Sequence, residues 1–339
     1  MGSEGDRKET GREGMHSKQA LFATGIAAGA AAMVLSGPIH AQTYPAKPVR
    51  IVIPFAAGGG TDIQGRLLAK KFFESMGQTF LVDNRAGASG LIGTELAAKS
   101  PPDGYTILFT TASLSVNVTL YAKRLAIDPL KDLQPISWIS SVPLVLVVHP
   151  SVPAKDVKSL LALAKKTGKL NAGHNGAGTT SHLAVEMLKQ SAGIEVEPIP
   201  YKGGGPSMAA LIGGEVDFNF ATALTVTPQL KAGKVRGLAV TTAKPSKAFP
   251  GLPTMISLYP GFDVDNWYAM FFPAATPKPL VDKINGEIRK ALAAKDVLDF
   301  MAREGADPVA SSPQELNALF KREVGKYAKV IKTANIVVQ

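Results

Sequence analysis

The chain is organised around one stretch, Ile51-Val52-Ile53-Pro54-Phe55-Ala56-Ala57-Gly58-Gly59-Gly60-Thr61-Asp62. Its apolar start predicts a buried strand, and the apolar periodicity that follows predicts a helix over 61–76, with Thr61 and Asp62 as capping residues. The three glycines allow a tight turn and leave backbone N–H groups uncovered by side chains. Uncovered N–H groups at the start of a helix bind anions. The stretch therefore predicts either an anion site or a plain tight turn.

The same order of strand, glycine loop and helix recurs along the chain, with similar loops at 84–90, 175–181 and 202–207. We expect further strands at 79–83, 105–110, 142–148, 170–174, 196–201, 217–221, 235–241 and 266–272. Strands that alternate with helices are typical of parallel sheets. The sequence therefore predicts an α/β protein in which each domain is a mainly parallel sheet flanked by helices.

Two domains joined by two hinge crossings, near 143 and 264, are the simplest arrangement. Residues 42–142 and 264–339 would form the first domain, and residues 143–263 the second. The chain ends in three helices, expected at 279–293, 295–304 and 313–333, that have no strands of their own. Such helices must cover an existing sheet, and we place them on the first domain.

Residues 15–41 are typical of a secretory signal peptide. Met15-His16-Ser17-Lys18 is a short basic start, residues 20–37 are apolar, and Ala41 is a small residue at the expected cut. We expect the mature chain to begin near Gln42 and to be exported to the periplasm. Residues 1–14 are a polar N-terminal extension that does not suit a signal peptide.

Composition limits the possible chemistry. The sequence has no cysteine, which excludes disulfides, catalytic thiols and cysteine-ligated zinc. Its net charge is +10, and this stays the same without residues 1–41, which hold four basic and four acidic residues. A basic surface attracts anions. The lysines are dispersed and no aromatic residues are interleaved in a basic run, so nucleic acid is not an expected partner.

Known catalytic motifs are incomplete. A dinucleotide fingerprint that starts at Gly58 would need glycine where Ile63 stands, and no glycine loop ends as a P-loop does. The segment 87–91 resembles a nucleophile elbow but lacks its last glycine. His174 and His182 do not have a metal-site spacing by themselves, and core or hinge packing is the favoured interpretation of Trp267 and Tyr268. We expect binding loops without a reaction centre.

Several short motifs stand in order along the chain: Pro45-Ala46-Lys47-Pro48-Val49-Arg50, the opening glycine stretch, Asn84-Arg85-Ala86-Gly87-Ala88, Pro102-Asp103-Gly104-Tyr105-Thr106, Val147-Val148-His149-Pro150, Pro200-Tyr201-Lys202-Gly203, Gly213-Gly214-Glu215-Val216-Asp217 and Leu238-Ala239-Val240-Thr241. Together they resemble the Bug proteins, the TctC-like periplasmic solute receptors of tripartite tricarboxylate transporters. The resemblance runs from about Tyr44 to Ala334.

This resemblance implies a flytrap fold that closes on a small carboxylate, without a cofactor, a metal or catalytic residues. The first domain would bind the ligand through Phe55, Ala57, Gly59, Gly60, Thr61, Asp62, Gly87, Ser89, Thr111 and Ser113. The second would bind it through His174, Gly176, Gly178, Thr179, Thr180, Ala221 and Thr222. These segments are also the expected helix starts at the carboxyl ends of strands, where open α/β sheets bind ligands.

The sequence departs from the family pattern at two places. Ala57 stands where the family commonly has proline, and Ala221-Thr222 stand where it often has Asp-Asn. Without an acidic residue at 221 the site has no partner there for an ammonium group. We therefore expect a dicarboxylate or an aromatic carboxylate rather than an amino acid.

The resulting hypothesis is a monomeric periplasmic binding protein, not an enzyme, that delivers its ligand to the membrane permease subunits of a tripartite tricarboxylate transporter. One alternative is a receptor that signals through a membrane partner. A periplasmic hydrolase is a weaker alternative.

Overall fold

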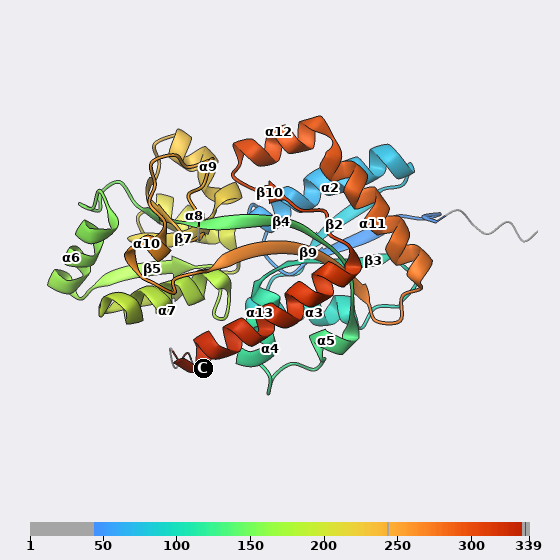
Figure 1. Ribbon diagram of the computed structural model, residues 1–339, viewed down its shortest axis with the longest axis horizontal. Coiled ribbons are helices and arrows are strands. Elements are labelled where there is room, and N and C mark those ends of the chain that lie inside the picture. The colour runs from blue at the N-terminus through green and yellow to red at the C-terminus, as the bar shows by residue number, and fades with distance from the viewer. Residues whose placement is uncertain (1–43, 243, 334–335, 337–339) are drawn as a thin grey trace, which may run out of the picture. The chain divides into compact units, whose positions relative to one another are not determined.

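Strands and helices alternate along the residues that the computed structural model describes, which are 44–242, 244–333 and 336 (Figure 1). The strands are β1 Val49–Ile53, β2 Phe80–Asn84, β3 Thr106–Thr111, β4 Leu133–Val148, β5 Leu170–His174, β6 Val196–Pro200, β7 Phe218–Thr222, β8 Arg236–Val240, β9 Asp265–Pro273 and β10 Asp307–Pro308. The helices are α2 Gly60–Met76, η1 Ala88–Gly90, α3 Leu91–Ala98, α4 Ser113–Leu120, α5 Pro129–Asp132, α6 Val157–Thr167, α7 Thr180–Ala192, α8 Gly204–Ile212, α9 Ala223–Lys231, α10 Met255–Leu258, α11 Lys278–Ala293, α12 Lys295–Arg303 and α13 Pro313–Thr333. The predicted extension 1–14 and signal peptide 15–41 lie outside the described residues.

The strands form one mixed sheet in the order β2-β1-β3-β9-β4-β7-β5-β6, with β8 and β10 also paired to β4. Both ends of this order are parallel, as the sequence predicts: β1 pairs with β2 and β3, and β5 pairs with β6 and β7. The strands in the middle, β4 and β9, pair with their neighbours in antiparallel fashion. The strand–loop–helix units of the parallel ends therefore lie on both sides of the middle strands β4 and β9 in the sheet order.

Strand β4 connects the two ends of the sheet. Its residues 133–143 pair with β9, whereas its residues 144–148 pair with β7 and β8. In Figure 1, β4 and β9 run together between the helices α2, α3 and α11 on one side and α6, α7 and α8 on the other. The change of partner after Pro143 lies where the first crossing is expected. The division into domains 42–142 with 264–339, and 143–263, stays our proposal.

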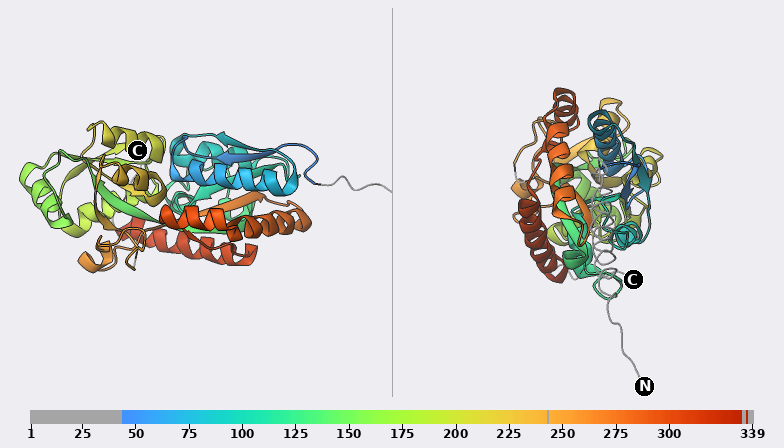
Figure 2. Two further views of the ribbon diagram at one scale, coloured as in Figure 1. Left: turned by 90° about the horizontal axis from the view of Figure 1, so that it is seen from above. Right: turned by 90° about the vertical axis from the view of Figure 1, so that its right-hand side faces the viewer.

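Helices cover both faces of the sheet. On one face of β1 and β3, Ile51 and Phe109 pack with Phe72 of α2 and Ile284 of α11 in a single core cluster. On the opposite face, residues of β1, β3 and β9 pack with α13, which also contacts α4 and β4. Figure 2 shows these last helices, drawn in orange and red, alongside the strands. The last helices therefore cover the β1–β3 end of the sheet, as expected.

Several elements differ from the expectation, among them β4 and α4. The crossing strand β4 begins at Leu133, nine residues before the expected Val142. The sequence did not indicate this first half, because serines interrupt its apolar residues and it contains Pro135. Helix α4 follows β3 directly, where we expected only the end of a strand. Its residues are mostly serine, threonine and valine, which are weak helix formers, and packing against α13 compensates.

Candidate functional site

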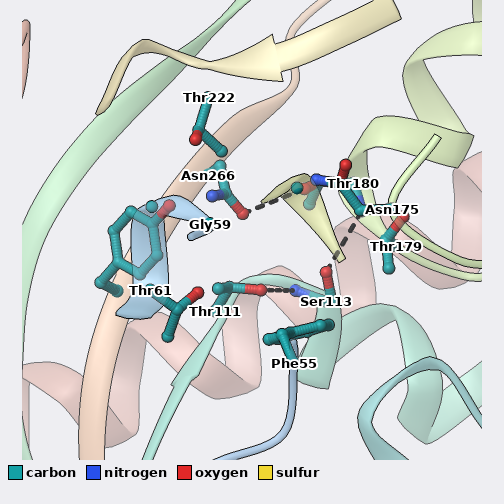
Figure 3. A pocket seen from close by; sticks show the side chains of 13 residues that line it. Phe55, Gly59, Thr61, Thr111, Ser113, Asn175, Thr179, Thr180, Thr222 and Asn266 are labelled. Atoms are coloured by element: carbon teal, nitrogen blue, oxygen red, sulfur yellow. Dashed lines mark hydrogen bonds between the residues drawn. The ribbon is translucent and has the colours of Figure 1, made fainter. Parts of the chain in front are cut away.

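A small cavity lies where β-strands end and helices begin (Figure 3). It encloses about 340 Å³ of space free of atoms, part of which is open to solvent. Its lining is polar and mostly made of small residues: Phe55, Gly59, Gly60, Thr61, Thr111, Ser113, Asn175, Thr179, Thr180, Gly204, Thr222, Asn266 and Tyr268. No lining residue carries a charged side chain. We call this space the first cavity.

Five helices start at the first cavity. They are α2 at Gly60, α4 at Ser113, α7 at Thr180, α8 at Gly204 and α9 at Ala223, just after Thr222. The first N–H groups of a helix have no partner within the helix, and the helix dipole makes them partly positive. The N-cap residues of α2, α4, α8 and α9 provide no side-chain hydrogen bond, whereas that of α7, Thr179, provides one. Main-chain groups arranged in this way are suited to bind an anion.

Hydroxyl groups in the first cavity form a chain of hydrogen bonds, drawn in Figure 3. The Ser113 N–H donates to Thr111 Oγ1 at 3.2 Å, and the Thr180 N–H donates to Ser113 Oγ at 3.3 Å. Thr180 Oγ1 donates to Asn266 Oδ1 at 3.0 Å. These bonds join the start of α4, the start of α7 and strand β9. Threonine and serine hydroxyls can donate as well as accept, so they can turn toward an anion.

Tyr268 and Thr222 explain why residue 60 is glycine. A Cβ at Gly60 would lie 2.5 Å from Tyr268 Oη and 2.7 Å from Thr222 Oγ1, closer than real contacts allow. Burial raises the pKa of Tyr268 above its ordinary value, although side-chain hydrogen bonds with Thr222, Thr61 and Asn266 lower it in part. The phenol therefore stays neutral at neutral pH. The phenol is thus available as a hydrogen-bond donor beside the start of α2.

The loop 174–180 is fastened by two buried histidines. His174 Nδ1 accepts from the Gly176 N–H at 3.3 Å, and His182 Nδ1 accepts from the Gly178 N–H at 3.1 Å. Burial, together with neighbouring His182, lowers the pKa of His174 to about 3, and burial also lowers that of His182. Both imidazoles are therefore neutral at neutral pH. In the described part of the chain, no group of three or more His, Cys, Asp or Glu residues could hold a metal ion.

Two glycine loops meet beside the first cavity. The Ala56 N–H donates to the Lys202 carbonyl at 3.0 Å. A Cβ at Gly205 would lie only 2.4 Å from the Ala57 carbonyl oxygen, and one at Gly59 would lie 3.4 Å from the Gly204 nitrogen. The backbones of segments 56–59 and 202–205 are thus in direct contact, which requires glycine at residue 205.

The structure brings together nine of the residues predicted to bind ligand: Phe55, Gly59, Gly60, Thr61, Thr111, Ser113, Thr179, Thr180 and Thr222. Three others, Gly87, Ser89 and Gly176, line a neighbouring cavity. The rest support the loops. Ala57 contacts Gly205, His174 accepts from the Gly176 N–H, the Gly178 N–H donates to His182, and Ala221 pairs with Val145 in the sheet.

Asp62 lies outside both linings. Its carboxylate accepts from the Gly58 N–H at 3.0 Å and pairs with Arg66 at 2.9 Å. Burial alone would raise its pKa, but the Arg66 guanidinium and the Gly58 N–H together lower it. The prediction that Thr61 and Asp62 cap the helix is wrong, because the N-cap of α2 is Gly59 and no side chain bonds to it there. Both residues lie in the first turn.

Four lining residues were not predicted: Asn175, Gly204, Asn266 and Tyr268. Asn175 lies within a predicted loop, and Gly204 lies in a second run of three glycines before a helix, so both had a local signal. Asn266 and Tyr268 lie on β9, an apolar strand for which packing is the favoured interpretation. Only the long-range pairing of β9 with β3 and β4 brings them to the cavity.

Comparison with known proteins agrees with this geometry. The model of the tripartite tricarboxylate transporter family receptor, TctC, matches residues 65–336. The chain belongs to the TctC family. Protein BugT of Bordetella pertussis is 36% identical over 302 residues, which are 88% of this chain and 92% of BugT. TctC proteins form a receptor family rather than an enzyme family.

Solved structures of the same kind are similar throughout. The periplasmic binding protein BugD has a TM-score of 0.84 and 36% identity, with 87% of this chain and all of BugD covered. The R. palustris protein Rpa4515, solved with adipate, has a TM-score of 0.84 and 34% identity, with 87% of this chain and 99% of that protein covered. The fold is therefore that of a TctC-type periplasmic binding protein. Among the described residues, every helix is too short or too polar to cross a bilayer.

Proposed function

We propose that this TctC protein binds a small organic carboxylate in the first cavity. The observation that carries the proposal is the meeting of five helix N-termini around a cavity whose lining has no charged side chain. A carboxylate would accept from N–H groups at the starts of α2, α7 and α8 and from the neighbouring hydroxyls. Hydrogen bonds to an ionised acceptor are stronger than neutral ones, and they gain further as water is excluded.

The ligand class follows from what the lining lacks. An amino acid would bring an ammonium group, whose burial needs an acidic or strongly accepting partner. The lining has no Asp or Glu, and residues 221 and 222 are alanine and threonine. Asp62 is turned to Gly58 and Arg66. The proposed ligand is therefore a dicarboxylate or an aromatic carboxylate, a class to which the adipate bound by the R. palustris neighbour belongs.

Binding would favour the closed arrangement of the two proposed domains. The first cavity takes residues from both, with Gly60 and Ser113 on one side and Thr180 and Gly204 on the other. A ligand that contacts both sides binds the closed form better than an open one and shifts the population toward it. The crossings of β4 and β9 near 143 and 264 would act as the hinge.

The cellular role follows from the family. The chain would be exported by the segment 15–41, act as a monomer in the periplasm, and deliver its ligand to the membrane permease subunits of a tripartite tricarboxylate transporter. The dispersed positive charge, +10 in total, would attract anionic ligands.

A screen of stability against ligand tests the proposal. Mature protein is heated with mono-, di- and tricarboxylates and with aspartate and glutamate, and hits are titrated by calorimetry. A ligand that binds only the folded state raises the melting temperature. At a ligand concentration of 100 times its Kd, the free energy of unfolding increases by about 2.7 kcal/mol. We expect amine-free carboxylates to stabilise the protein. Tight binding of aspartate or glutamate without any response to amine-free carboxylates would contradict the proposed ligand class.

A further inference from the structure

A second cavity lies beside the first. The space among its lining atoms is about 590 Å³, part of which is open to solvent. It is lined by Pro54, Phe55, Gly87, Ala88, Ser89, Gly90, Asn175, Gly176, Ala177, Pro200, Tyr201 and Lys202. Phe55 and Asn175 also line the first cavity. These two residues therefore stand between the two cavities.

The boundary between the cavities combines an apolar ring and an amide. The Phe55 side chain is 8% exposed and offers an apolar surface to both sides. Asn175 Oδ1 is buried and has no hydrogen-bond partner among the described residues. A buried acceptor without a partner destabilises the protein, and a bound molecule can satisfy it. The boundary thus fits the middle of a ligand rather than a closed wall.

The wall of the second cavity is held in a strained conformation. Ala88 and Ser89 have φ values of 45° and 57°, which non-glycine residues rarely adopt, and such strain is common at ligand clamps. The Asn117 side chain donates to the Ser89 carbonyl at 2.9 Å. The Tyr121 hydroxyl lies 3.3 Å from Ser89 Oγ and donates to the Ala177 carbonyl on the opposite side at 2.9 Å. These bonds tie the segment at Ser89 to the segment at Ala177.

The charge of the second cavity differs from that of the first. Its lining includes Lys202 and no acidic residue. Lys202 is exposed and forms no ion pair within the described part of the chain, although its carbonyl is fixed by the Ala56 N–H. Other lysines, such as Lys71 and Lys290, are paired with carboxylates. An exposed lysine without an ion pair, in the lining of a cavity, is suited to bind an anionic group.

We infer that the second cavity takes the second anionic group of an elongated dianion, and that Lys202 is the residue that selects it. One carboxylate would lie at the helix N-termini of the first cavity, an apolar chain would pass Phe55, and the second carboxylate would lie near Lys202. This inference rests on the proposed function and adds to it a preference for ligand length. A dianion too short to pass Phe55 gains nothing from Lys202.

The test compares unbranched α,ω-dicarboxylates of increasing length with monocarboxylates of the same length, by calorimetry on the wild type and on Lys202→Met. In the wild type we expect affinity to peak at one dicarboxylate length. Lys202→Met should lower the affinity for that dicarboxylate by roughly tenfold and change the monocarboxylate affinity by less than about twofold. It should also weaken the dependence of the dicarboxylate affinity on ionic strength.

Lys169→Met is the matched control. Lys169 is also exposed and forms no ion pair among the described residues, but it lies between α6 and β5, outside both linings. It should leave both affinities unchanged. If carboxylates bind but Lys202→Met acts equally on mono- and dicarboxylates, or on neither, the inference is wrong and the proposed function stands. If no carboxylate binds the wild type, both fail.

Discussion

The two loops on either side of the first cavity are fastened by opposite chemistry. In the loop 57–62 a charged group does this, because the Asp62 carboxylate accepts from the Gly58 N–H and pairs with Arg66. In the loop 174–180 neutral groups do it, because His174 and His182 accept from two glycine N–H groups. Each loop delivers the start of a long helix to the same cavity.

The difference shows what the site requires of its supports. A carboxylate serves in the first loop because Arg66 balances its charge and because it lies outside the lining of the cavity. Imidazoles serve in the second loop because burial keeps them neutral. In both cases the support adds no net charge to the cavity. The partly positive helix N-termini are then the main electrostatic feature that an anion meets.

The largest expected effect comes from adding a side-chain atom where the two glycine loops are in contact. Gly205→Ala is compatible with helix α8 itself, but its Cβ would lie 2.4 Å from the Ala57 carbonyl oxygen in the neighbouring glycine loop. We expect ligand affinity to fall by roughly 5- to 150-fold, which corresponds to the 1–3 kcal/mol typical of overpacking. Calorimetry with the best carboxylate measures the loss.

Gly286→Ala is the control for that change, since a Cβ at Gly286 in α11 meets nothing within 4 Å. It should leave affinity unchanged. Unaltered affinity in Gly205→Ala, together with a matching loss of folding stability, would show that the two sides do not separate in solution.

The second expected effect is a loss of folding stability at low pH. The pKa of His174 is about 3 in the folded protein, below its ordinary value of 6.5, so between these values only the unfolded chain takes up this proton. The stability that neutral His174 contributes is complete above pH 6.5 and is lost as the pH falls toward 3, at no more than about 1.4 kcal/mol per pH unit. The contribution of Asp62 in the first loop should persist to lower pH, because the pKa of Asp62 is lowered from 3.8 and its carboxylate stays ionised there.

His174→Asn makes this difference measurable, since asparagine offers a similar acceptor but does not titrate. Urea unfolding at a series of pH values should show a shallower loss of stability below pH 6.5 in the variant than in the wild type. Equal slopes in the two proteins would mean that His174 does not couple the second loop to pH.

The smallest effect tests the one side-chain cap. Thr179 Oγ1 accepts from the His182 N–H at the start of α7, whereas the N-cap of α2 is Gly59 and uses no side chain. Thr179→Ala should cost about 1 kcal/mol of folding stability, and Thr179→Ser should recover most of it. Thermal or urea unfolding measures both. No difference between alanine and serine would indicate that the second loop, like the first, needs no side-chain cap.

Much of the fold follows from local patterns in the sequence. Strand β5 spans Leu170–His174 as predicted, and α13 spans the predicted 313–333, because apolar periodicity and breakers mark both. The first half of β4 was missed because its serines and Pro135 do not form an apolar run. Its pairing with β9, more than a hundred residues away, has no local signature.

The site residues also divide into those with a local signal in the sequence and those placed by long-range pairing. Helix starts such as Gly60 and Thr180 were predictable, because glycine loops before periodic segments are a local signal. Tyr268 and Asn266 were not, because a strand interior gives no sign of which residue faces a cavity. Asp62 was placed in the site by its position beside the glycines, whereas its partner Arg66 turns it outward.

The first cavity also determines how such a site can be mapped experimentally. Its principal donors are main-chain amides, which every amino acid except proline possesses, so alanine scanning would leave them all in place and would report only the surrounding hydroxyls. Amide hydrogen exchange at the starts of α2, α7 and α8, measured with and without a carboxylate, would observe these donors directly.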